Sequence, residues 1–280
     1  MVQRVCRVEE RLSIVQVGGN FRAMADRTVQ LVLQYDGARF AGWQRQPTVR
    51  TVQGELERAF GQLMGGVATV TGAGRTDSGV HARGQAAHVK VPDRWTLERL
   101  RRGLNALLPE DIWVAAAHTM DNRFHARYSA LSRCYSYYVG TDDGADSPFR
   151  RRYEWRAPGQ ELDEKALYQA AEMIVGDHKF RGFAVRGTAP AADDHRCLVS
   201  SAEWRVREGG YVFVIEANRF LHHMVRFLVG TMLDVALGRR TLASLADLLD
   251  AEDNSCVSPP APPHALFLDR VIYPETLYSK

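Results

Sequence analysis

An aspartate that can do chemistry lies in a glycine-rich segment, residues 72–81, GAGRTDSGVH. Arg75 precedes Asp77 by two positions, close enough for its guanidinium to keep the carboxylate ionised by charge and hydrogen bonding. An ionised and oriented carboxylate can serve as a nucleophile or as a base. The glycines permit backbone conformations closed to other residues and let a ligand approach the main chain. We therefore take Asp77 as the candidate catalytic residue of this loop.

Two other interpretations of the loop stay open at this point. Asp77 can be a turn former, because aspartate bonds its own backbone two residues further on. The loop can also be a phosphate cradle, but its GxGxxxxG spacing is not the dinucleotide fingerprint, and no Lys-Ser or Lys-Thr pair completes a P-loop. A carboxylate in such a cradle repels phosphate unless a metal or an arginine offsets it. The nucleotide-binding interpretation is therefore the weaker one.

Strands are expected on both sides of this loop. Residues 67–71 and 85–91 are β-branched or alternate in hydrophobicity, which is typical of short strands. Residues 28–35 form the first convincing strand, and alternate apolar side chains from Val29 to Tyr35 share one face. The candidate catalytic loop is thus expected at the ends of strands.

The loop as a whole resembles a family signature. Residues 73–82, AGRTDSGVHA, are similar to the motif of the tRNA pseudouridine synthases that modify the anticodon arm, the TruA family. Further segments agree with the family in order, namely residues 35–46, 124–127, 133–137 and 222–230. The resemblance covers roughly residues 28–273, and five motifs in family order are hard to obtain by accident.

The resemblance implies an activity and a set of site residues. Members isomerise uridine to pseudouridine on the 3′ side of the tRNA anticodon stem and loop, at positions 38–40. The family places a helical arginine against the catalytic aspartate, which makes Arg226 the expected partner of Asp77. Tyr135 occupies the place where the family presents a tyrosine to the target uridine, so it would hold the flipped base. Arg75 and Arg226 would fix the charge and geometry of Asp77.

The implied reaction breaks the bond from N1 to C1′, turns the base and joins C5 to C1′. It involves no redox change, so no cofactor, nucleotide or metal is expected. Asp77 could attack C1′, attack the pyrimidine or remove the 2′ proton, and the sequence does not choose among these. The resemblance further implies a homodimer whose basic clefts span both subunits and hold the tRNA.

The composition is ordinary for a globular protein. With 45% hydrophobic and 25% charged residues, a chain of 280 residues can bury a sizeable core as one large or two small domains. No run of about 18 apolar residues predicts a membrane span, and the N-terminus lacks the apolar core of a secretion signal. The four cysteines are too far apart for a CxxC metal pair and too few for a disulfide scaffold. We therefore expect reduced thiols and a cytoplasmic location.

The charge balance allows an RNA partner without establishing one. The formal net charge is only +3, but 32 of the 36 basic residues are arginine. Arginine offers bidentate hydrogen bonds to phosphate and stacks on bases, although a compositional bias of the genome explains the excess equally well. Arginine clusters at residues 99–102, 150–152 and 239–240 are candidate phosphate-binding faces or merely solvated surface.

The order of elements predicts an α+β protein with the pseudouridine synthase fold. Two related α/β halves are expected to share a mostly antiparallel central sheet, with helices packed on it and a cleft between the halves. We expect an N-terminal half with the catalytic loop at residues 27–140, a connection at 141–160 and a C-terminal half at 161–280. Residues 1–26 would be a loosely ordered N-terminal extension or the product of a misplaced start.

Helices are expected after the caps Thr51, Thr96 and Thr241 and near Asp163, and the longest helix is expected at residues 219–237. Two histidines within that longest helix invite a metal-binding interpretation. Adjacent residues on a helix point about 100° apart, so both side chains cannot easily ligate one ion. We therefore interpret the pair, at positions 222 and 223, as hydrogen-bonded structural histidines.

Two functions of other classes compete with the synthase. An RNA-binding module without chemistry would carry the arginine surface but would have no need for Asp77 beside Arg75 and Arg226. A nucleotide or sugar-phosphate enzyme would use the glycine loop as an anion-binding nest. An assay on tRNA, with and without magnesium and nucleotide, separates the three.

Overall fold

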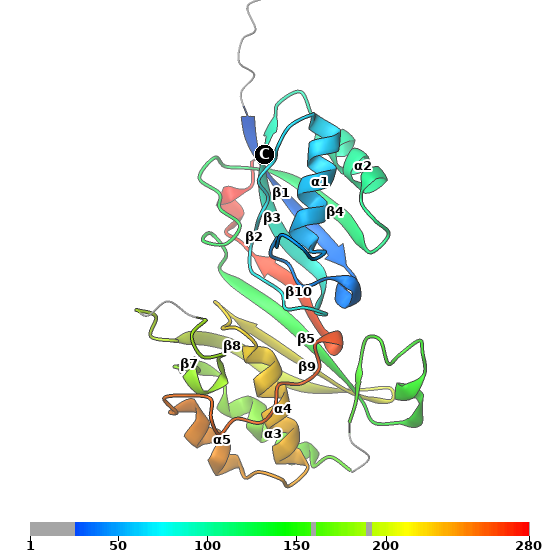
Figure 1. The fold of residues 1–280 in the computed structure, drawn as a ribbon. Coiled ribbons are helices and arrows are strands. Elements are labelled where there is room, and N and C mark those ends of the chain that lie inside the picture. Colours follow the sequence, from blue (N-terminus) through cyan, green and yellow to red (C-terminus); the bar gives the residue numbers. More distant parts are fainter. Residues whose placement is uncertain (1–25, 158–160, 189–191, 280) are drawn as a thin grey trace, which may run out of the picture.

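A single ten-stranded sheet runs through the part of the chain that the computed structural model describes, residues 26–157, 161–188 and 192–279 (Figure 1). The main strands follow the order β4-β1-β3-β10-β5-β9-β8-β7, while β2 pairs with β3 and β6 pairs with β5. Among the strands of the described residues, only the β10–β3 and β5–β6 pairs are parallel. The predicted α+β class with a mostly antiparallel sheet is confirmed.

The strands span Asp26–Tyr35 (β1), Thr71–Gly72 (β2), His81–Pro92 (β3), Ile112–Met120 (β4), Ser132–Gly140 (β5), Trp155–Arg156 (β6), Gly176–His178 (β7), Cys197–Arg207 (β8), Gly210–Ala217 (β9) and Leu266–Ile272 (β10). The α-helices span Val52–Met64 (α1), Leu97–Leu107 (α2), Glu164–Met173 (α3), Met224–Ala236 (α4) and Leu242–Leu249 (α5). Figure 1 shows α1 and α2 on the part of the sheet that contains β1, β3 and β4, and the other helices near β5, β8 and β9.

Four of these helices begin where predicted, three of them after predicted caps and α3 directly after Asp163. In each, a side-chain oxygen accepts a hydrogen bond of 3.0–3.3 Å from the backbone N–H three residues further on, which satisfies a donor that the first helical turn leaves unpaired. The caps are Thr51, Thr96, Asp163 and Thr241. The first strand also has its predicted buried face, with Val29, Leu31 and Leu33 fully buried.

The strand predicted at residues 67–71 is wrong for most of its length, because β2 contains only Thr71 and Gly72. Helix α1 satisfies the backbone of Val70 instead. The Val70 N–H donates to Glu57 Oε1 at 3.2 Å, and the Val70 carbonyl accepts from Gln53 Nε2 at 3.0 Å. These side chains take the place of a neighbouring strand.

The helix predicted at residues 219–237 begins five residues later than expected, at Met224. Asn218 would make a good helix cap, but its side chain accepts a hydrogen bond of 2.9 Å from the Leu198 N–H and so continues the pairing of β8 with β9. His223 then adopts a left-handed conformation with φ of +63°. Residues 219–223 therefore form a turn that enters α4, and this turn matters for the candidate site below.

Strand β10 connects the two sides of the sheet. It runs parallel to β3, with Phe267 opposite His81, and antiparallel to β5, with Leu268 opposite Tyr135. The end of the catalytic loop and the predicted base-binding tyrosine thus lie on the two strands that flank β10. Residues 141–157 also do more than connect, because β6 extends the sheet beside β5 and Tyr153 Oη donates to Asp36 Oδ2 at 3.0 Å.

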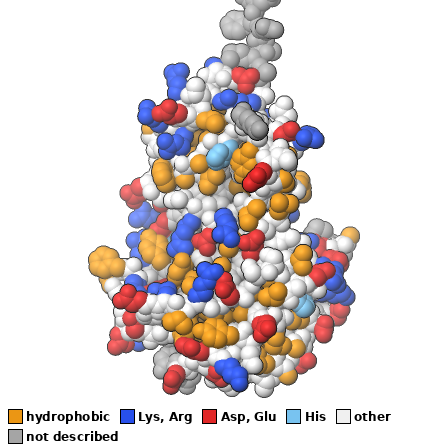
Figure 2. All heavy atoms as spheres, turned by 180° about the vertical axis from the view of Figure 1, so that it is seen from behind, with side chains coloured by type: hydrophobic (Ala, Val, Ile, Leu, Met, Phe, Trp, Pro, Cys, Tyr) orange, Lys and Arg blue, Asp and Glu red, His pale blue; other side chains and the backbone are white. Residues whose placement is uncertain are grey.

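The face of the molecule seen in Figure 2 carries basic and acidic side chains next to each other. Strands β3, β8, β9 and β10 contribute ion pairs to the molecular surface, including Arg83 with Asp269 at 3.2 Å and Arg270 with Glu216 at 3.0 Å. The longest helices of the described residues have 13 residues, and none is long and apolar enough to cross a membrane.

Two expectations can be compared with the structure only in part. The expected N-terminal extension lies outside the described residues except for Asp26, which begins β1. Cys134, Cys197 and Cys256 are free thiols, as expected, and the first two are buried.

Candidate active site

The loop that carries Asp77 connects β2 to β3 and is fixed by backbone hydrogen bonds from other segments. The Trp43 N–H donates to the Thr76 carbonyl at 3.1 Å, and the Gly79 N–H donates to the Phe40 carbonyl at 3.3 Å. The side chain of Gln85, which is fully buried, donates to the Gly74 carbonyl at 3.0 Å. These bonds hold the backbone on both sides of Asp77, so the main-chain position from which its side chain extends is fixed.

Two glycines of the 35–46 segment allow it to pack closely against this loop. A Cβ atom at Gly37 would lie 2.0 Å from the Val80 carbonyl oxygen, and one at Gly42 would lie 2.6 Å from the Thr76 carbonyl oxygen. Gly42 also has a φ of +86°, a backbone conformation that residues with a side chain seldom adopt. The loop that carries Asp77 is thus positioned by direct contact of its backbone with the backbone of residues 35–46.

Arg226, on the first turn of α4, forms the predicted ion pair with Asp77. Its Nη1 atom lies 3.2 Å from Asp77 Oδ2, and its Nε atom donates to the Ala261 carbonyl at 2.7 Å. Only 12% of the arginine side chain and 16% of the aspartate side chain are exposed. A guanidinium this deeply placed needs an acidic partner, and Asp77 supplies it.

Two histidines that we interpreted as hydrogen-bonded structural residues also face the carboxylate, and the helical geometry behind that interpretation is wrong. His222 Nε2 lies 3.5 Å from Asp77 Oδ1, and His223 Nε2 lies 3.4 Å from Asp77 Oδ2. Neither imidazole makes a hydrogen bond with any of the described residues. Burial lowers the pKa of His223, and the charge of Asp77 opposes that shift. The expected helical geometry does not apply, because both residues precede α4.

Tyr135, on β5, lies in the same neighbourhood. The residue is 9% exposed, and its ring packs edge-to-face on Phe220, with 5.1 Å between ring centroids. Burial raises the pKa of Tyr135, and the negative charges of nearby groups, including Asp77, add to the shift. The hydroxyl is therefore a neutral donor near Asp77, and it makes no hydrogen bond with any residue in the described ranges.

Arg75 was predicted to pair with Asp77, but the structure shows no ion pair or hydrogen bond between the two side chains. The Arg75 side chain is exposed, and it forms no ion pair with any residue that the structure describes. The structure thus brings Asp77, Arg226 and the neighbouring Tyr135 together, adds His222 and His223, and leaves Arg75 at the surface of the same loop. Neighbouring positions in an irregular loop can point in different directions, so short sequence separation was a poor guide here.

The segment at residues 124–127 supports the loop from the other side. Arg133 Nη2 donates to the carbonyl oxygens of Ala73, at 3.1 Å, and Arg127, at 2.8 Å. The Ala126 N–H donates to His88 Nδ1 at 3.1 Å. Burial and the positive charges nearby lower the pKa of His88 to about 4, so this ring is neutral and its Nδ1 atom can accept the bond.

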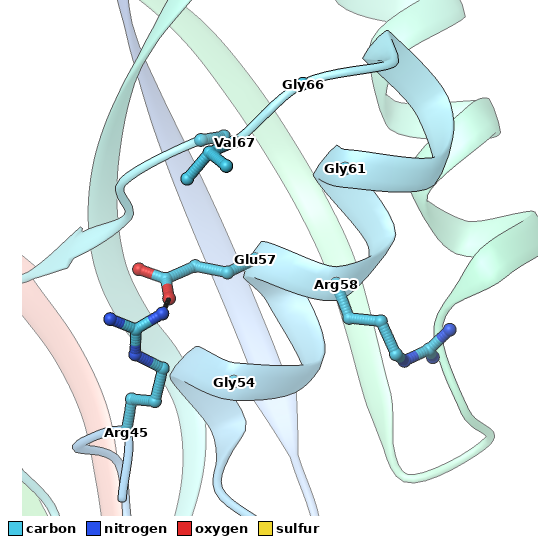
Figure 3. Close-up of a pocket in the computed structure, with 8 residues that line it drawn as sticks. Arg45, Gly54, Glu57, Arg58, Gly61, Gly66 and Val67 are labelled. Carbon is cyan, nitrogen blue, oxygen red and sulfur yellow. Dashed lines mark ion pairs between the residues drawn. The ribbon is translucent and has the colours of Figure 1, made fainter. Parts of the chain in front are cut away.

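A separate pocket of about 470 Å³ lies between α1 and the chain that follows it (Figure 3). Arg45 and Glu57 line it and pair with each other at 3.2 Å, so their charges are mutually satisfied. Val67 at its edge is 99% exposed. None of the residues that surround Asp77 lines this pocket, which we therefore do not assign to the chemistry.

Comparison with known proteins agrees with the motifs. A sequence model of the tRNA pseudouridine synthase family matches residues 31–129 and 170–274, which together are more than half of the chain. A protein of Shewanella amazonensis called tRNA pseudouridine synthase A is 38% identical over 257 residues, covering 89% of this chain and 94% of its own. A protein of the same name from Dictyoglomus turgidum is 39% identical over 248 residues, which cover 87% of this chain and 98% of the relative. A third protein of this name, from Geobacter sp., is 38% identical over 253 residues, which cover 89% of this chain and 100% of the relative.

Both matched ranges contain part of the site geometry. The first includes Asp77 and its glycine loop, and the second includes Arg226 with the two histidines. Taken with the mostly antiparallel sheet, these matches show that the chain belongs to the tRNA pseudouridine synthase family.

Proposed function

We propose that this protein isomerises uridine to pseudouridine in the anticodon stem-loop of tRNA, at positions 38–40, with Asp77 as the nucleophile or base. The observation that supports this most is the ion pair between Asp77 and Arg226, which fixes a mostly buried carboxylate beside Tyr135. Such a carboxylate is suited to chemistry at a sugar or base that is brought to it, and less suited to simple RNA binding.

The reaction needs a small set of groups, and this site offers them. The bond from N1 to C1′ breaks, the bond from C5 to C1′ forms, the C5 proton leaves and N1 gains a proton. Atoms and electrons balance without an oxidant or reductant. Asp77 attacks C1′ or the pyrimidine, or removes the 2′ proton, while Arg226 holds its carboxylate in one orientation. Tyr135 provides an aromatic surface for the detached base and a neutral hydroxyl that can donate a hydrogen bond to it.

Positive groups near the loop would bind the RNA. Arg75 and Arg127 are exposed and form no ion pair with the residues that the structure describes. Tyr128 is 78% exposed beside Arg127, whose guanidinium carbon lies 5.7 Å from the centre of the tyrosine ring. An arginine next to an exposed aromatic ring suits a phosphate followed by a stacked base. We further propose that Arg75 contacts the substrate directly.

The remaining features of the proposal concern the assembly. We propose that the protein acts in the cytoplasm as a homodimer, in which each tRNA contacts both subunits. Measurement of the molar mass in solution, with and without tRNA, tests the homodimer. A protein that stays monomeric at the concentrations of the assay contradicts it.

Replacement of Asp77 tests the catalytic assignment. Asp77→Ala should abolish pseudouridine formation in unmodified tRNA, as mapped by primer extension after carbodiimide treatment, while the Kd for tRNA changes less than threefold or so. Asp247→Ala removes an exposed carboxylate on α5 and should retain full activity. Full activity of Asp77→Ala would refute the assignment. A wild-type protein that binds tRNA but yields no product would instead indicate an RNA-binding module.

A further inference from the structure

Three potential metal ligands converge on one point of the site. Asp77, His222 and His223 each offer a ligand atom, and these atoms lie within 4.8 Å of one another. The two distances from imidazole nitrogen to carboxylate oxygen are 3.5 and 3.4 Å. In a tetrahedral zinc site, with bonds of about 2.0–2.1 Å, neighbouring ligand atoms are about 3.3–3.4 Å apart. Each imidazole nitrogen is thus about as far from a carboxylate oxygen of Asp77 as two neighbouring ligand atoms are in a zinc site.

Hydrogen bonding does not account for this arrangement. The contacts are long, no hydrogen bond joins either imidazole to the carboxylate, and neither ring has another hydrogen-bond partner among the described residues. The conformation is also costly, because His223 has a φ of +63°, which non-glycine residues seldom adopt. That conformation turns the chain just before α4 and lets two consecutive imidazoles face the same carboxylate, with 4.2 Å between their ring centroids.

The three side chains are also accessible. The exposed fractions are 44% for His222, 26% for His223 and 16% for Asp77. An ion can therefore enter from solvent, and water can fill the fourth position. Two imidazoles and one carboxylate with an open position form a donor set that zinc uses in proteins.

We propose that Asp77, His222 and His223 bind a transition-metal dication of the zinc class, and that the bound ion inhibits the enzyme by occupying the Asp77 carboxylate. The inhibition rests on the proposed function of Asp77, whereas the binding does not. Nitrogen donors favour zinc, cobalt and copper over magnesium, which prefers oxygen ligands and keeps its water. Magnesium should therefore leave activity unchanged.

Arg226 opposes the metal and supplies a sharp test. Its Nη1 atom lies 3.2 Å from Asp77 Oδ2, the same oxygen that His223 faces, so an incoming dication meets a positive charge. Removal of that charge in Arg226→Met should strengthen metal binding by about tenfold or more, since each 1.4 kcal/mol of relieved repulsion corresponds to a factor of ten. The same change should weaken catalysis, so binding and activity should move in opposite directions.

Cobalt titration of the metal-free full-length protein measures binding without any tRNA. A visible absorption band of tetrahedral Co²⁺ should grow to one equivalent and be displaced by Zn²⁺. His222→Ala and His223→Ala should each weaken binding about 10–100-fold, and the double variant should abolish it. His178→Ala, on β7, should bind as the wild type does. A band that persists in the double variant, or no saturable binding at all, would overturn the proposal.

A second measurement tests inhibition. Zn²⁺ should inhibit pseudouridine formation with a midpoint equal to its Kd from the titration, and a chelator should restore activity. Binding without inhibition would overturn the inhibitory role alone. A wild-type protein that binds zinc but forms no pseudouridine even with the chelator present would contradict the proposed function and leave the metal site standing.

Discussion

The guanidinium of Arg226 is held at two points, by Asp77 and by the main chain. Its Nη1 atom lies 3.2 Å from Asp77 Oδ2, although 149 positions separate the two residues, and its Nε atom donates to the Ala261 carbonyl at 2.7 Å. The arginine is therefore oriented before any substrate binds. Because both charges are largely shielded from water, neither can lose its partner cheaply.

Replacement of Arg226 by methionine should affect both folding and catalysis. The apolar chain can fill the same space, but the mostly buried carboxylate of Asp77 loses its strongest partner, at a cost of roughly 2–4 kcal/mol. Thermal unfolding should then occur about 5–12 °C lower, and kcat should fall at least about a hundredfold. Arg226→Lys keeps the charge without the second hydrogen bond and should recover part of the activity.

Arg102→Met is the matched control, because Arg102 is exposed on α2 and, among the described residues, forms only a surface pair with Glu98. Surface pairs contribute about 1 kcal/mol or less. Equal losses of activity in Arg102→Met and Arg226→Met would refute a special role for Arg226.

Two substitutions of Tyr135 distinguish the role of its ring from the role of its hydroxyl. Tyr135→Phe keeps the ring packed on Phe220 and removes a hydroxyl that lacks a partner among the described residues, so the melting temperature should change by no more than about 2 °C. Tyr135→Ala leaves a cavity and should cost about 3–5 kcal/mol. We expect Tyr135→Phe to lower kcat about tenfold or more at unchanged stability. Wild-type kinetics in that variant would show that only the ring matters.

Gly42 tests the close contact that positions the catalytic loop. Gly42→Ala combines a disfavoured φ of +86° with a Cβ only 2.6 Å from the Thr76 carbonyl oxygen, so either Gly42 or the loop must move. We expect a loss of about 2–4 kcal/mol in the free energy of unfolding, together with reduced kcat. Gly66→Ala has open space around it and should be neutral in both measurements. A neutral Gly42→Ala would contradict the positioning argument.

His88 should make stability depend on pH. Its pKa is lowered to about 4, so between pH 4 and about 6.5 the unfolded chain binds more protons than the folded protein. Stability should therefore fall as the pH is lowered through this window and level off below it. Because the ring is only partly buried, the contribution is about 1–2 kcal/mol.

Thermal melts of wild type and His88→Asn across this range measure the effect. Asparagine offers an oxygen near the position of Nδ1 and can still accept the Ala126 N–H, but it does not titrate. The pH dependence of the melting temperature should be shallower in the variant. Parallel curves for the two proteins would contradict the assignment.

The sequence was most informative where local rules determine structure. The helix caps and the alternating face of β1 appear as predicted, because each depends on residues a few positions apart. The strand expected at 67–71 failed because α1 satisfies the backbone of Val70. That competition involves residues far apart in the chain, which local periodicity does not reveal.

The site itself shows the same division. The pairing of Arg226 with Asp77 was expected only from resemblance to a family, since the pattern around Arg226 fits a surface-directed arginine equally well. The helical geometry expected for His222 and His223 was wrong, because the apolar periodicity of α4 continues backwards through a turn that is not helical. Tertiary contacts impose that turn, including a hydrogen bond of 3.2 Å from the Val185 N–H to the His222 carbonyl.

The position of β10 determines when this enzyme can become active during its synthesis. Residues 266–272 are made after all the other strands, yet they lie between β3 and β5. Until they emerge from the ribosome, β3, which follows the Asp77 loop, and β5, which lies in the part of the sheet near α4 and Arg226, have no strand between them to join them. A nascent chain that lacks these residues should therefore be inert towards RNA, however well its earlier elements have folded.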